Sequence, residues 1–212
     1  GVFQPYLNGR DTAFAVLNAR QVAAKSFIQN DELVTFTECS SNNLAVARGE
    51  FFAAGMWHDI FGDGPTLWGD VEFGYRVWKQ GLKFLRVASA KLYHRDHHVE
   101  NMKVACRRAY HVSRTVHFLF QKYPEITQHI VMFQDKHPIS LRSDSPNLVI
   151  HKFFHAVTAC PPGLWAMERL MQIVESTDPE SRLLDLLYQW IVSAYIFRGY
   201  RQGLSDLTAA KV

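Results

Sequence analysis

The pattern of predicted strands and helices changes near residue 99, and this change constrains the fold more than any other feature of the sequence. Before it, short apolar runs alternate with turn-forming residues and short amphipathic segments, which is typical of mixed α/β structure. After it, apolar residues recur at helical spacing almost to the end of the chain. We therefore predict an α/β region at residues 1–98 and a helical tail at residues 99–212.

The α/β region is predicted to hold three helices and four strands. The helices cover residues 12–29, 49–54 and 70–80, and the strands cover residues 33–36, 44–47, 83–87 and 91–93. Gly55 and Gly81 are expected at the ends of the second and third helices, because glycine tolerates the left-handed backbone found there. The strand at 44–47 is expected to be buried because it is apolar. Helices of the tail are predicted at residues 99–122, 126–134, 148–158, 164–176 and 179–200.

The composition is that of a globular protein and gives no sign of nucleic-acid binding. Of its 212 residues, 48% are hydrophobic and 20% are charged, so the chain can bury a substantial core. The formal net charge is only +3, and no dense stripe of lysine and arginine is present. We therefore expect no nucleic-acid partner.

Cysteine usage and hydropathy indicate a cytoplasmic location. The three cysteines are widely spaced and form no CxxC motif, which favours a reducing compartment and argues against a structural zinc site. The apolar segment 183–197 is about 15 residues long and too polar to span a bilayer. No signal peptide is visible, and the absence of an initial methionine suggests a piece of a longer protein. A peripheral contact with the inner face of the membrane is left open.

Asp70 begins the predicted helix 70–80 and is the main catalytic candidate. The dipole and free amides of a helix N-terminus favour a negative charge there, and a carboxylate can take a proton from a hydroxyl group. The alternative is a purely structural N-cap, which is the commoner use of an aspartate in this position. Glu72 and Arg76 are spaced i, i+4 on the same helix, which predicts a surface ion pair.

Several polar and aromatic residues occur in a fixed order between residues 38 and 94. In chain order they are Asn42 and Asn43 before a predicted strand, Trp68 and Asp70 at a helix start, Gly81 at its end, and His94 after the last strand. This order resembles the acceptor-side, C-terminal half of family 2 glycosyltransferases, in particular the galactosyltransferase C-terminal type. These enzymes have the GT-A fold, that of nucleotide-diphospho-sugar transferases.

The resemblance implies a partial GT-A mixed sheet with a C-terminal α-helical tail, and a role in polysaccharide biosynthesis. The reaction would transfer a hexose from a nucleotide-diphosphate sugar to a hydroxyl group of a glycan, lipid or protein. Asp70 would be the general base, and His94 would complete a divalent-metal site for Mn²⁺ or Mg²⁺. The residues expected to contact the substrates are Asn42, Asn43, Trp68 and Arg76.

The sequence also departs from the family pattern. Gly69 stands where the family often has an acidic residue, no Asp-x-Asp motif is present, and residues 1–37 are too short for the nucleotide-binding half. We therefore expect little activity from this chain alone. One alternative is a catalytically degenerate interaction module. Another is an unrelated α/β domain with a small metal site at His94, His97 and His98.

Overall fold

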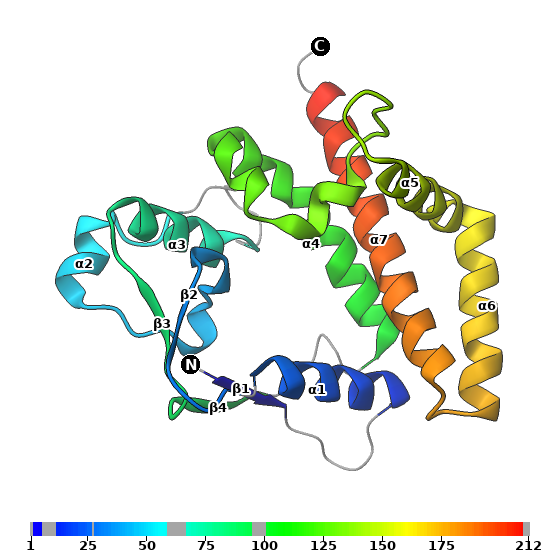
Figure 1. The fold of residues 1–212 in the computed structure, drawn as a ribbon, viewed down its shortest axis with the longest axis horizontal. Coiled ribbons are helices and arrows are strands. Elements are labelled where there is room, and N and C mark those ends of the chain that lie inside the picture. Colours follow the sequence, from blue (N-terminus) through cyan, green and yellow to red (C-terminus); the bar gives the residue numbers. More distant parts are fainter. Residues whose placement is uncertain (1, 6–11, 27, 59–66, 95–100, 210–212) are drawn as a thin grey trace. The chain divides into compact units, whose positions relative to one another are not determined.

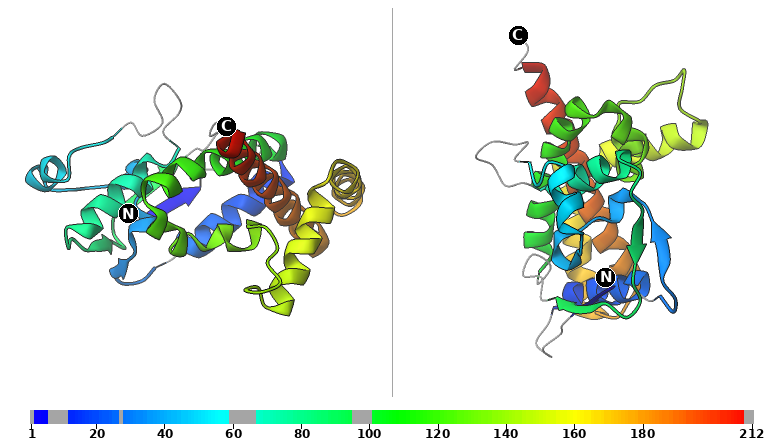
Figure 2. Two further views of the ribbon diagram at one scale, coloured as in Figure 1. Left: turned by 90° about the horizontal axis from the view of Figure 1, so that it is seen from above. Right: turned by 90° about the vertical axis from the view of Figure 1, so that its left-hand side faces the viewer.

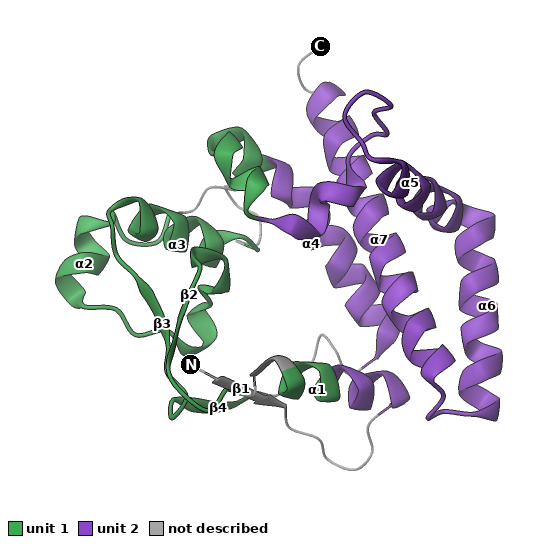
Figure 3. Ribbon diagram, in the orientation of Figure 1, with its two compact units in different colours: residues 1–6, 19–95, 118–129 green, residues 7–18, 96–117, 130–212 purple. Residues whose placement is uncertain are grey.

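The computed structural model describes residues 2–5, 12–26, 28–58, 67–94 and 101–209, which form a mostly helical α/β protein (Figure 1). The chain divides into two compact units (Figure 3). Unit 1 contains residues 1–6, 19–95 and 118–129, and unit 2 contains residues 7–18, 96–117 and 130–212. This division differs from the predicted boundary at residue 98, because residues 118–129 group with unit 1 and residues 7–18 with unit 2.

The strands of unit 1 form two short ladders. Strand β1 (Val2–Pro5) pairs in parallel with β4 (Lys91–His94), and β2 (Glu32–Val34) pairs antiparallel with β3 (Phe84–Arg86). Within the described residues these are separate two-stranded sheets, whereas one mixed sheet was expected. The described structure is mostly helical with two short ladders, which is compatible with the expected mixed α/β class.

The predicted buried strand at 44–47 is wrong. These residues join no ladder, and Ala45, Val46 and Ala47 are exposed. Leu44 alone packs against the core of unit 1. The apolar composition did not predict the structure of this segment, because a strand also needs a partner strand to satisfy its backbone hydrogen bonds.

The helices of unit 1 are short and end where the sequence indicates. They are α2 (Arg48–Ala53), α3 (Gly69–Lys79), the C-terminal part of α1 (Ala13–Ser26), and the 3₁₀ helices η1 (Phe36–Glu38), η2 (Ser41–Asn43) and η4 (Pro124–Gln128). Gly55 and Gly81 follow α2 and α3 with φ angles of +81° and +89°, as predicted.

Helix α3 is central to the core of unit 1. It buries Phe73 and Val77 against Cys39 and Ala54. Gly74 allows η1 to approach closely, because a Cβ at this position would lie 2.7 Å from Cys39 Cβ. The packing of α3 therefore fixes the positions of the segments before and after it.

Unit 2 is helical. It contains most of α4 (Met102–Lys122), the 3₁₀ helix η5 (Val131–Lys136), α5 (Pro146–Ala159), α6 (Pro161–Thr177) and α7 (Arg182–Ala209). Helices α5 and α6 both pack on α7, as Figures 1 and 2 show. The core between the helices includes Leu164, Leu184, Leu187, Tyr188 and Ile191. Among the described residues, no helix has the length and apolar character needed to cross a membrane.

Candidate functional site

Asp70 lies in the first turn of α3, beside η2. Its side chain is half-buried, and Ser41 Oγ donates a hydrogen bond to Asp70 Oδ2 at 3.2 Å. The two residues are 29 positions apart in the sequence. The fold therefore brings the segment containing Asn42 and Asn43 to the N-terminus of the helix that carries the candidate base.

The second part of η2 is linked to the turn before β4. Asn43 Nδ2 donates to the carbonyl oxygen of Ala90 at 3.0 Å, and Asn42 is exposed. His94 ends β4, with its backbone paired opposite Pro5. The side chain of His94, and all of His97 and His98, lie outside the described residues, so the metal-binding roles expected of these histidines stay predictions.

Cys39 also lies near Asp70, but its thiol is protonated near neutral pH and does not act as a nucleophile. Burial, together with the negative charge of Asp70, raises the pKa of the Cys39 thiol to about 12. Because the thiolate is the reactive form, this thiol is inert near neutral pH. Cys39 is therefore not a candidate nucleophile.

Trp68 precedes α3 and is largely buried. Only 7% of its surface is exposed. Stacking on a sugar requires a free ring face, so the substrate contact expected of Trp68 would need this ring to be uncovered. That role stays a prediction.

Glu72 is fully buried, so the predicted ion pair with Arg76 is present but does not lie at the surface. Arg76 Nε lies 3.0 Å from both carboxylate oxygens, and Nη2 lies 2.9 Å from Oε2. Lys122 Nζ and Tyr123 OH donate to Oε1 at 3.1 and 2.9 Å. Burial alone would raise the pKa of Glu72, but the hydrogen bonds from Arg76, Lys122 and Tyr123 hold this pKa below its ordinary value.

Arg76 is committed to the same network. Besides Glu72, its guanidinium group binds the carbonyl oxygens of Ala54, through Nη1, and of Met56, through Nη2 at 2.6 Å. Each nitrogen of the guanidinium group thus has a partner within the protein. This geometry favours a structural role for Arg76 over the predicted contact with substrate.

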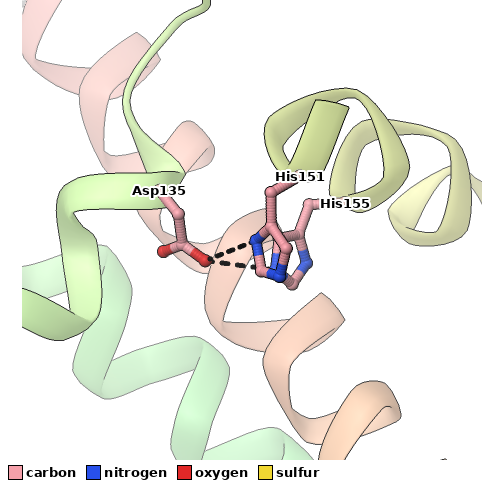
Figure 4. Close-up of side chains that lie close together, drawn as sticks. All are labelled: Asp135, His151 and His155. Carbon is pink, nitrogen blue, oxygen red and sulfur yellow. Dashed lines mark ion pairs between the residues drawn. The ribbon is translucent and has the colours of Figure 1, made fainter. Parts of the chain in front are cut away.

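A second polar cluster, which we call the Asp135 cluster, lies in unit 2 and was missed in the sequence. It consists of Asp135 from η5 and of His151 and His155 from α5 (Figure 4). Asp135 Oδ2 lies 3.4 Å from His151 Nδ1 and 3.2 Å from His155 Nε2. One potential ligand atom from each residue lies within 4.8 Å of the other two. The i, i+4 spacing of the two histidines on a predicted helix was the available signal.

Lys136 is the cation beside this cluster. Its Nζ lies 2.6 Å from Asp135 Oδ2 and 3.3 Å from His155 Nε2. Burial alone would raise the pKa of Asp135, but the interactions of this carboxylate with His155 and with the Lys136 ammonium group hold the pKa below its usual range. Burial also lowers the pKa of Lys136.

The surroundings fix the rings of the histidines. The His155 ring is 2% exposed and stacks on Trp190 of α7, with ring centroids 5.0 Å apart and planes 7° apart. The His151 ring meets His155 edge to face at 4.9 Å and is about half exposed. The cluster thus has a rigid buried side and a side open to solvent.

Comparisons with protein-family models, with curated proteins and with solved structures found no match to this chain. Its function must therefore be argued from its own residues.

Proposed function

We propose that unit 1 is the acceptor-side half of a nucleotide-sugar-dependent glycosyltransferase with a GT-A fold, and that Asp70 is its general base. The observation that carries this proposal is the contact between Asp70 and Ser41. It joins two segments that the family resemblance assigns to one pocket, although 29 positions separate them. The half-buried carboxylate remains partly accessible to an acceptor.

The proposed step is a direct displacement at the sugar. The acceptor hydroxyl oxygen forms a bond to the anomeric carbon while the bond from that carbon to the diphosphate oxygen breaks. The nucleoside diphosphate leaves with the bonding electron pair, and the proton of the hydroxyl passes to Asp70. Ser41 would orient the carboxylate by its hydrogen bond to Oδ2.

The metal expected of the intact enzyme, Mn²⁺ or Mg²⁺ with His94 among its ligands, would stabilise the charge of the leaving diphosphate. The described residues around Asp70 do not assemble three metal ligands, since the group that does so is the Asp135 cluster of unit 2. Donor binding belongs mainly to the expected nucleotide-binding half. The proposal for this chain rests on acceptor activation alone.

The test is nucleotide-sugar turnover by the protein at its natural length. Asp70→Asn keeps the size of the side chain and removes the base, so we expect turnover to fall by about 100-fold or more. Glu50→Gln changes an exposed carboxylate of α2 and is the matched control. Turnover that is unchanged in Asp70→Asn would remove Asp70 from the mechanism.

A second candidate function is an interaction module that has lost catalysis. It is favoured by Arg76 and Trp68, two expected substrate contacts that are instead held within the protein. The same assay separates the two functions. A folded wild-type protein that turns over no nucleotide sugar, with or without Mn²⁺, would favour the module.

A further inference from the structure

We propose that Asp135, His151 and His155 form a binding site for a divalent transition metal, with Zn²⁺ as the best match. This site lies in unit 2 and does not depend on the function proposed for unit 1. It has two imidazole ligands and one carboxylate, a donor set that suits zinc and leaves a fourth position for water.

The distances between the donor atoms support a metal site. Zinc bonds of about 2.0–2.1 Å in tetrahedral geometry place neighbouring ligand atoms about 3.3 Å apart. Asp135 Oδ2 lies 3.2 Å from His155 Nε2 and 3.4 Å from His151 Nδ1. The two histidines therefore lie at distances typical of ligands that share an ion.

The cluster is preorganised on one side and accessible on the other. The stack on Trp190 fixes the His155 ring, and helical spacing places His151 beside it. Within the described part of the chain, buried His155 Nδ1 has no hydrogen-bond partner, so the stack on Trp190 and the contacts of Nε2 set the ring orientation. The half-exposed His151 gives an ion access from solvent.

Lys136 competes with the metal for these atoms. Its ammonium group lies 2.6 Å from Asp135 Oδ2 and 3.3 Å from His155 Nε2, the two atoms that would bind zinc. A donor bond from Lys136 to Nε2 uses the same lone pair as a metal bond. Zinc binding therefore requires the lysine side chain to move away, and the proposal predicts that removing the ammonium group tightens binding.

The experiment measures Zn²⁺ binding to the EDTA-treated chain by competition with a chromogenic chelator. Tetrahedral coordination is checked by the visible absorption of bound Co²⁺. We expect one Zn²⁺ per wild-type chain, affinity lowered by more than about 100-fold in His151→Ala, and tighter binding in Lys136→Met. His151→Ala is the preferred variant because this residue is half exposed and its loss should leave the fold intact.

His111→Ala is the matched control, because it removes an exposed histidine of α4. It should bind zinc like the wild type. Binding that is retained in both His151→Ala and Asp135→Asn would overturn the proposal, as would the absence of binding by the wild type. Binding by Lys136→Met alone would also overturn it, since the lysine would then be the resident cation of the site.

Discussion

Among single residues, Glu72 is the one in unit 1 for which we predict a large loss of stability on substitution. Its buried carboxylate is shared by Arg76, Lys122 and Tyr123. Glu72→Gln preserves the shape but leaves the two cations without their counter-charge, which typically costs about 3 kcal/mol or more. We expect this decrease in the free energy of unfolding, measured by urea denaturation.

Glu32→Gln is the matched control for that measurement. Glu32 also pairs with an arginine, Arg86 at 2.7 Å, but its side chain is 46% exposed. Exposed ion pairs contribute about 1 kcal/mol or less, so this variant should be almost as stable as the wild type. If both variants lost the same free energy of unfolding, burial would not explain the contribution of Glu72 to stability.

Among the secondary-structure elements, α4 and α7 of unit 2 approach each other closely at two glycines. Gly199 and Gly203 are one helical turn apart on α7, and each faces a backbone carbonyl of α4, at Tyr110 and Arg114. A Cβ at either glycine would overlap that carbonyl oxygen. The backbone of one helix thus lies directly against the other, which only glycine permits.

Alanine at these glycines is expected to destabilise the protein despite its higher helix propensity. Gly199→Ala and Gly203→Ala should each lower the free energy of unfolding by about 2 kcal/mol, because the helices must separate. Gly49→Ala in α2, where nothing lies within 4 Å of the added Cβ, should gain up to about 1 kcal/mol. Thermal denaturation compares the three, and a gain at Gly203 would contradict the close contact.

For the whole molecule, the pKa shifts predict a stability plateau between about pH 7 and pH 9. Burial lowers the pKa of His117, so its contribution is present above the ordinary pKa of 6.5 and is lost as the pH falls. The lowered pKa of Glu72 adds a further loss below about pH 4.5. Neutral His117 and ionised Glu72, the forms present at neutral pH, are the forms that the folded protein favours.

The alkaline limit follows from buried cysteines and tyrosines. Burial raises the pKa of Cys39 and of Cys106 to about 12, so their contribution is complete below the ordinary pKa of 9 and is lost as the pH rises. Burial raises the pKa of Tyr123 and of Tyr200 to about 12, so their contribution is complete below the ordinary pKa of 10 and is lost as the pH rises towards 12. Melting temperatures from pH 4 to pH 11 should fall on both sides of the plateau. A melting temperature that is constant from pH 7 down to pH 4 would contradict the assignment of His117 and Glu72.

Much of the helical structure could be predicted because its causes are local. The glycines at the ends of α2 and α3, and the apolar spacing of α5, α6 and α7, act within a few residues. Asp70 at a helix N-terminus was correctly anticipated for the same reason. Short-range backbone preferences do not depend on the rest of the molecule.

The tertiary structure alone decided which side chains are buried and what they contact. Glu72 is buried because residues about 50 positions later in the sequence, Lys122 and Tyr123, cover it. Asp135 meets His151 and His155 through the packing of η5 on α5. A sequence pattern fixes the face of a helix on which a residue lies. Long-range packing decides which element covers that face. Because burial removes water, a charged side chain on a covered face must find its partners within the protein.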